Sequence, residues 1–105
     1  MRFIETRIFT RAIRRLLLDD EYRALQLALV FRPEQGPVIR GSGGLRRVRW
    51  GAGGHGKRGG VLIIYYWDKA RGTFYMLFAY SKSEQEDLNP EQLQLLSRLV
   101  REEFK

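Results

Sequence analysis

Positive charge gathers in one stretch of the chain, residues 40–67, which contains no aspartate or glutamate. Uncompensated cations beside a glycine-rich loop predict an anionic ligand, and the aromatic side chains nearby offer surfaces on which nucleic-acid bases can stack. RNA is therefore the first ligand to consider, although the same aromatic rings would also suit a protein core. The cations of the stretch and the only histidine of the chain are Arg40, Arg46, Arg47, Arg49, His55, Lys57 and Arg58.

Arg47 and Arg49 are distinguished by their spacing. Residues 45–50 alternate in the manner of a β-strand, whose successive side chains point to opposite faces. We therefore expect Arg47 and Arg49 on one face, and Val48 and Trp50 on the other. Two guanidinium groups on a shared surface would hold a phosphate group, but a solvated strand face would show the same pattern.

RNA cleavage by attack of a 2′ oxygen on the neighbouring phosphate requires a proton acceptor, charge neutralisation and protonation of the leaving 5′ oxygen. Arginine cannot accept the proton because its pKa lies above about 12, so Arg47 and Arg49 would neutralise charge. A histidine titrates near neutrality, and arginines around a lysine lower its pKa. The candidates for proton transfer are His55, Lys57, Tyr80, Lys82 and Glu84. His55 can equally be an incidental surface residue, and Lys82 and Glu84 can equally form a surface ion pair.

Hydrophobic periodicity predicts the elements that position these residues. Apolar side chains recur every three to four residues over 8–17 and 22–31, as in two amphipathic helices, with Asp19 or Asp20 as the cap of the second. Residues 61–67 are apolar on both faces, which predicts a central strand covered on each side. Asn89 caps a further helix that starts at Pro90. With strands at 1–5, 45–50 and 73–81, the order is β-α-α-β-β-β-α, an α+β fold.

Length and composition limit the remaining possibilities. The 105 residues suffice for one domain, spanning 1–105, with a single hydrophobic core. A formal net charge of +7 predicts an anionic partner. The absence of cysteine suits a reducing cytoplasm, and no apolar run approaches the roughly 20 residues of a membrane span. One histidine and scattered carboxylates predict neither a metal site nor a cofactor.

The sequence resembles the HigB branch of the RelE-type toxins of bacterial toxin–antitoxin systems in three segments that occur in the same order. They are GLRRVRW at 44–50, GGVLIIYYW at 59–67 and YSKSEQEDL at 80–88. The resemblance implies a RelE-like α+β domain, in which two N-terminal helices pack on a curved antiparallel sheet, followed by a C-terminal helix. It also implies cleavage of mRNA in the ribosomal A site, and neutralisation by a HigA-like antitoxin with a helix-turn-helix motif.

The resemblance also implies roles for individual residues. The family's basic pair on the second strand corresponds to Arg47 and Arg49, and its lysine after the last strand corresponds to Lys82. Relatives usually carry an arginine early in the third strand, where this chain has Leu62. That change removes a group that stabilises charge on the phosphate, unless a cation reaches in from the glycine-rich loop. Apart from the resemblance, the residues expected to contact RNA are Arg40, Arg46, Arg58 and Tyr80, and Lys57 is the other loop cation.

Two further functions remain open at this point. A ParE-like toxin shares the fold class but inhibits DNA gyrase by binding to it, which does not require convergent phosphate clamps. A catalytically weak RNA-binding homologue, or a basic binding module without activity, would explain Leu62.

Overall fold

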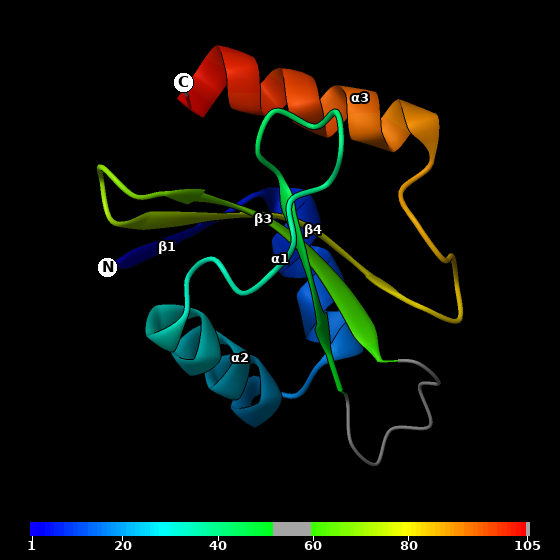
Figure 1. Cartoon of the computed structure of the whole chain (residues 1–105). Coiled ribbons are helices and arrows are strands. Elements are labelled where there is room, and N and C mark those ends of the chain that lie inside the picture. The colour runs from blue at the N-terminus through cyan, green and yellow to red at the C-terminus, as the bar shows by residue number, and fades with distance from the viewer. Residues whose placement is uncertain (52–59, 105) are drawn as a thin grey trace.

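The computed structural model describes residues 1–51 and 60–104, which form an α+β fold (Figure 1). The chain begins with a strand and two helices, continues with three strands, and ends with a helix that passes into a π-helical turn. This succession confirms the predicted β-α-α-β-β-β-α order. The bounds are Arg2–Glu5 for β1, Arg7–Leu16 for α1, Asp19–Phe31 for α2, Arg46–Trp50 for β2, Val61–Asp68 for β3, Thr73–Ser81 for β4, Pro90–Leu99 for α3 and Val100–Phe104 for the π-helical turn.

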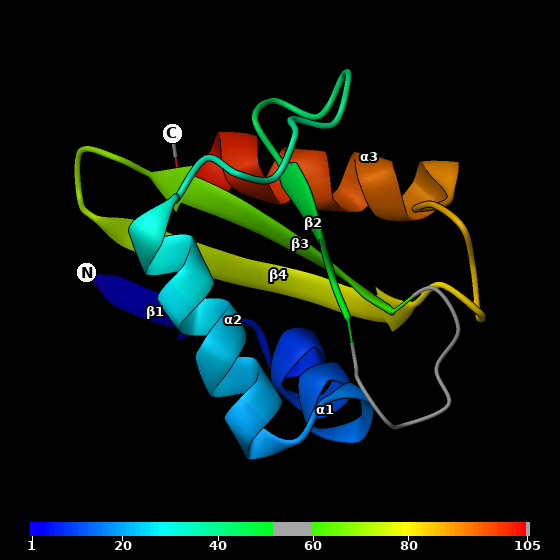
Figure 2. The same cartoon turned by 60° about the horizontal axis from the view of Figure 1, so that its bottom comes forward.

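The four strands form a mixed sheet in the order β1-β4-β3-β2. β3 pairs antiparallel with both β2 and β4, whereas β1 runs parallel to β4 at the edge of the sheet (Figure 2). The expectation of a wholly antiparallel sheet is therefore wrong for β1. No tight turn joins β1 to β4, because two helices and two strands lie between them, so packing sets their direction. Phe3 stacks on Phe74 there, with 4.6 Å between the ring centroids.

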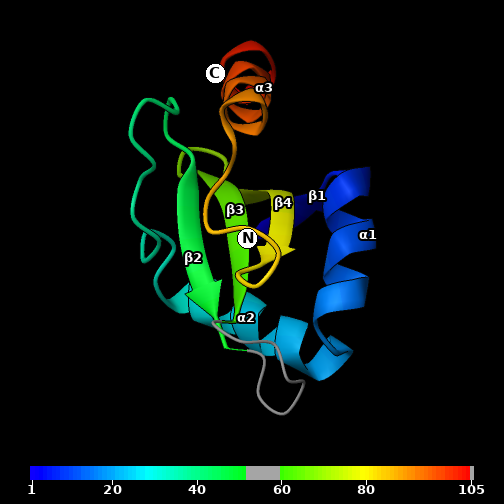
Figure 3. The same ribbon diagram turned by 90° about the vertical axis from the view of Figure 1, so that its right-hand side faces the viewer.

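Helices cover both faces of the sheet, and α2 and α3 lie on opposite sides of the strands (Figure 3). On one face α1 and α2 pack against Val61, Ile63 and Tyr65 of β3. On the other face α3 packs against Leu62 and Ile64. All five residues are buried, which confirms the predicted central strand. The apolar side chains thus form two clusters, and the expectation of a single core is wrong because the sheet separates them.

A side-chain cap marks the start of α3, whereas the N-cap residue of α2 makes no side-chain cap. Asn89 and Gln92 form the predicted capping box of α3, with N···O distances of 2.8 and 3.0 Å between each side chain and the other backbone N–H. The predicted cap of α2 is wrong, because Leu18 is the N-cap and Asp19 and Asp20 lie in the first turn. Their negative charge complements the helix dipole there. Within the described residues, every helix is too short or too polar to cross a membrane.

Candidate nucleic-acid interface

Strand β2 carries Arg47 and Arg49 on the face of the sheet that α3 covers. Their cross-strand partners on β3 are Ile64 and Leu62, and both partners belong to the cluster beneath α3. Val48 lies in the opposite cluster, beneath α1 and α2. The two guanidinium side chains therefore share one side of the sheet, as the alternation predicted.

A cavity of about 390 Å³ brings these arginines together with Lys82, the first residue after β4. The N–H of Lys82 donates a hydrogen bond to the carbonyl of Gly60 at 3.1 Å, which keeps the end of β4 beside the start of β3. Leu62 contributes an apolar part of the cavity wall. Three cations from two segments that lie far apart in the sequence thus face one space. Such an arrangement suits an anion with several oxygen atoms.

Carboxylates from the segment after β4 line the same cavity. Asp87 makes an ion pair with Arg47, and Glu86 lies next to it in the lining. Gln85 holds this segment by donating hydrogen bonds to the carbonyl of Asp87 at 2.8 Å and to the side chain of Gln92 at 2.9 Å. The Arg47 and Asp87 side chains are 42% and 67% exposed, so their pairing contributes about 0 to 1 kcal/mol. A phosphate group can therefore replace the carboxylate.

Tyr80 lies on the same face of the sheet, opposite Leu62 in the β3–β4 register. It is 2% exposed, and its hydroxyl has no hydrogen-bond partner among the described residues. Burial raises the pKa of Tyr80, and the nearby guanidinium group of Arg47 offsets part of that increase. The hydroxyl therefore stays protonated at neutral pH, and it does not line the cavity.

The loop between α2 and β2 is held against the sheet by Tyr65 and Arg46. The Tyr65 hydroxyl donates a hydrogen bond to the carbonyl of Pro33 at 2.8 Å and accepts one from the N–H of Gly36 at 3.1 Å. Arg46 donates hydrogen bonds to the carbonyls of Glu34 and Gly36 at 3.1 and 2.8 Å. These contacts fix a loop that forms part of the cavity wall.

Several predicted site residues do not line this cavity, and Tyr80 is one of them, because it lines the cavity that contains Glu84. The Glu84 carboxylate accepts a hydrogen bond from the N–H of Ser81 at 3.1 Å and pairs with Arg15 of α1 at 3.5 Å, in a different cavity. Arg46 anchors the loop on the opposite face, and Arg40 is exposed in the loop before β2. His55, Lys57 and Arg58 lie outside the described residues.

The aromatic residues of the basic stretch pack into the two clusters, which confirms the alternative that they belong to the core. Trp50, Tyr65 and Trp67 belong to the cluster beneath α1 and α2, and the ring centroids of Trp67 and Phe74 lie 4.3 Å apart. Tyr66 belongs to the cluster beneath α3.

Sequence reasoning does not identify Gln35, Pro37, Glu86 or Asp87 as parts of the site, although all four line the cavity. A signal for the two carboxylates is present, because they follow Lys82 by a few residues, just beyond a predicted strand. Gln35 and Pro37 carry no local signal, since only the contacts of their loop with β3 bring them to the cavity.

No model of a known protein family matches this chain. Within residues 1–51 and 60–104, histidine, aspartate and glutamate side chains form no group of three or more that would hold a metal ion.

Proposed function

We propose that this chain is the toxin of a type II toxin–antitoxin system, a ribosome-dependent mRNA endonuclease of the HigB branch of the RelE superfamily. The observation that carries the proposal is the cavity lined by Arg47, Arg49 and Lys82. The resembling segments supply these same residues, since GLRRVRW contains both arginines and YSKSEQEDL contains the lysine. Converging cations of this kind bind the phosphodiester backbone of a nucleic acid.

The proposal includes a RelE-like fold. The two N-terminal helices on one face of the sheet and the antiparallel strands β2, β3 and β4 support this part of the proposal. The parallel strand β1 departs from the antiparallel sheet that the resemblance implies.

In the proposed reaction, a ribose 2′ oxygen attacks the adjacent phosphorus, the bond to the 5′ oxygen breaks, and a 2′,3′-cyclic phosphate and a 5′ hydroxyl result. Arg47 and Arg49 neutralise the charge that gathers on the phosphoryl oxygens. Lys82 lines the cavity beside the arginines and is the group placed to accept the 2′ proton. The leaving 5′ oxygen takes a proton from water. The ribosome contributes by holding the mRNA in an attack geometry.

A catalytically weak RNA-binding protein is a second candidate, and Leu62 is the observation that favours it. Leu62 is 4% exposed and lines the cavity with an apolar side chain, at the position where the resembled family usually has arginine. A group that stabilises a developing oxyanion commonly contributes about 3 to 4 kcal/mol to catalysis. We therefore expect Leu62→Arg to increase cleavage, whereas a loss of cleavage in that variant would contradict the proposed position of the phosphate.

Induced expression in a bacterium, with mapping of RNA ends, tests the endonuclease proposal. The wild type is expected to arrest growth and to produce new in-frame cuts in translated messages, and the Arg47→Ala/Arg49→Ala variant is expected to do neither. The matched control is Arg23→Ala/Arg98→Ala, which removes the same charge from exposed positions on α2 and α3. Growth arrest with intact mRNA and an SOS response would reject the proposal in favour of gyrase inhibition.

The proposal also specifies the partners and the compartment. The substrate is mRNA in the A site of the ribosome, so the protein would act in the cytoplasm. The antitoxin would be a HigA-like helix-turn-helix protein encoded next to this chain. Co-expression of that neighbour is expected to restore growth, and persistent arrest would contradict its role as antitoxin.

A further inference from the structure

Helices α1 and α3 and strand β4 border an apolar groove away from the Arg47 and Arg49 cavity. Ile8 of α1 and Leu95 of α3 are 59% and 60% exposed on its two sides, and Leu77 and Phe78 of β4 lie between them. The groove has a volume of about 170 Å³. Apolar cavities of roughly 150 Å³ accommodate a benzene molecule, so the groove has room for one large apolar side chain.

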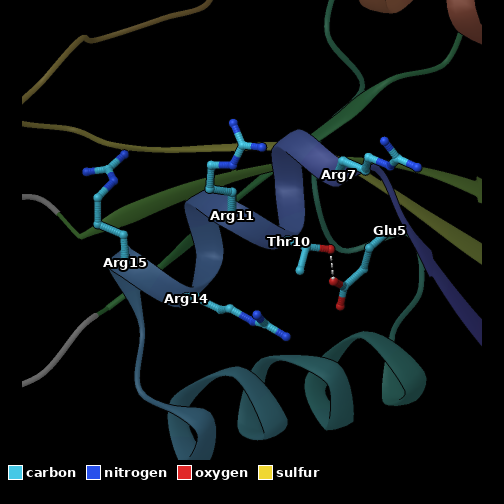
Figure 4. A pocket seen from close by; sticks show the side chains of 6 residues that line it. All are labelled: Glu5, Arg7, Thr10, Arg11, Arg14 and Arg15. Atoms are coloured by element: carbon cyan, nitrogen blue, oxygen red, sulfur yellow. Dashed lines mark hydrogen bonds between the residues drawn. The ribbon is translucent and has the colours of Figure 1, made fainter.

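A stripe of arginines runs along α1 beside this groove. Arg7, Arg11 and Arg14 follow one another at intervals of four and three residues, which places them on one face of the helix. None of them makes an ion pair with a described residue, and their side chains spread outward from α1 (Figure 4). Arg11 also lines the larger cavity, of about 470 Å³, that shares Ile8 with the groove.

Two carboxylates near this stripe offset only part of its charge, and Asp19 lines a cavity with Arg14 alone of the three arginines. Glu5 lines the same cavity as the arginines, but its two oxygens accept hydrogen bonds from the hydroxyls of Thr10 at 2.5 Å and Tyr22 at 2.6 Å. The stripe therefore presents positive charge to an external partner. Exposed apolar side chains beside uncompensated charge are typical of a surface that another molecule covers.

We propose that the groove and the arginine stripe together bind an acidic amphipathic helix of a partner protein. One large apolar side chain of that helix enters the groove, and its carboxylates lie opposite Arg7, Arg11 and Arg14. An RNA backbone would use the arginines but would leave the apolar groove exposed. A second copy of this chain, with a net charge of +7, is disfavoured by repulsion.

The surface lies apart from the candidate nuclease cavity, since the two share no lining residue. A partner helix bound here would therefore leave Arg47, Arg49 and Lys82 open unless the partner extends further. If the proposed function holds, the partner is the antitoxin, and that identification rests on the proposed function. The binding surface itself does not depend on it.

Binding of two synthetic peptides to the full isotope-labelled chain tests the proposal by NMR. One peptide of about 18 residues, long enough to form a helix when bound, carries leucine at helical spacing on one face and glutamate on the other. The second peptide carries lysine in place of each glutamate. The glutamate peptide is expected to shift the amide signals of Ile8, Leu77 and Leu95, and the lysine peptide is expected not to bind.

Two matched substitutions distinguish binding in the groove from nonspecific hydrophobic binding elsewhere on the surface. Leu95→Asn in the groove is expected to weaken binding of the glutamate peptide by about tenfold or more. Leu27→Asn on α2 removes an equally exposed leucine, 60% in both cases, and is expected to leave the affinity unchanged. Equal effects of the two variants, or equal affinity of the two peptides, would overturn the proposal. A single-stranded RNA that shifts the arginine signals while the glutamate peptide shifts none would overturn it as well. None of these measurements involves cleavage or toxicity, so failure of the proposed function would leave them unaffected.

Discussion

At the scale of single residues, Arg47 can pair either with a carboxylate of the protein or with an anionic ligand. Its guanidinium group pairs with Asp87 and lies near the buried hydroxyl of Tyr80. Arg49, by contrast, makes no ion pair with a described residue and is exposed. The strength of phosphate binding therefore depends on how easily Arg47 exchanges its carboxylate partner.

Replacing Asp87 by asparagine is expected to strengthen RNA binding, because the ion pair between Arg47 and Asp87 then no longer has to break before Arg47 binds a phosphate. An exposed ion pair is worth about 0 to 1 kcal/mol, so we expect the affinity for a labelled single-stranded RNA to rise by about two- to fivefold. Fluorescence anisotropy at low salt measures the change. Glu103→Gln, at an exposed position after α3, gives the same change in net charge. An equal increase in both variants would show that net charge alone is responsible.

Replacing Tyr80 by phenylalanine separates stability from catalysis. A buried hydroxyl without a partner costs about 1 to 3 kcal/mol, so we expect the free energy of unfolding to stay the same or to rise by about 1 kcal/mol. Cleavage is expected to fall by far less than the roughly 100-fold that loss of a general acid costs, because the hydroxyl does not line the cavity. Urea unfolding and RNA-end mapping provide the two readouts, with Tyr66→Phe as the control on β3. A clear loss of stability in the Tyr80 variant would mean that its hydroxyl has a partner in the folded chain.

At the scale of elements, β2 depends on the loop that precedes it. The N–H of Arg47 donates a hydrogen bond to the carbonyl of Pro37 at 3.1 Å, and Tyr65 holds the other end of the loop. Gly36 lies where the loop touches the sheet. A Cβ atom added there would come within 3.0 Å of both the Arg47 carbonyl oxygen and the Tyr65 ring.

Gly36→Ala is therefore expected to displace the loop from β2 and to lower the free energy of unfolding by about 1 to 3 kcal/mol. RNA binding is expected to weaken in the same variant, because the displacement moves the backbone that carries Arg47. Urea unfolding and anisotropy measure the two effects. Gly51→Ala is the matched control, since an added Cβ there has no neighbour within 4 Å. Equal stability of the two variants would contradict close contact between the loop and the sheet.

At the scale of the whole molecule, helices on both faces of the sheet bury tyrosines that belong to different elements. Tyr22 of α2, Tyr65 of β3 and Tyr80 of β4 all have a raised pKa, and burial is the largest cause in each case. The Glu5 carboxylate raises the pKa of Tyr22 further through its hydrogen bond and its charge. The folded chain thus binds these protons more tightly than the unfolded chain.

This linkage predicts a loss of stability at alkaline pH. A tyrosine in the unfolded chain has a pKa near 10.0. The stabilisation that the buried, protonated tyrosines give to the folded chain is therefore fully present below that pH, and it declines as the pH rises above it. We expect the free energy of unfolding to fall between about pH 9 and pH 11, and to fall less steeply in Tyr65→Phe. Urea titrations of the wild type and of Tyr65→Phe across this pH range measure the difference. Lysine and arginine residues are the same in both proteins, so they affect both slopes of unfolding free energy against pH alike. Equal slopes would show that burial does not raise the pKa of Tyr65.

The sequence by itself determined the order of helices and strands, the capping box at Asn89 and the common face of Arg47 and Arg49. Each of these follows from contacts between residues close in the chain, or from the alternation of side chains along one strand. The apolar pattern of β3 also predicted that both faces of this strand are covered.

Only the tertiary structure decided which of the polar residues meet. Asp87 pairs with Arg47, Glu84 turns toward Arg15 of α1, and Arg46 anchors a loop instead of facing the cavity. Tertiary packing also decided the parallel direction of β1 relative to β4. In each case the partner lies 10 or more residues away in the chain. Such contacts depend on how whole elements pack, and local periodicity carries no information about that packing.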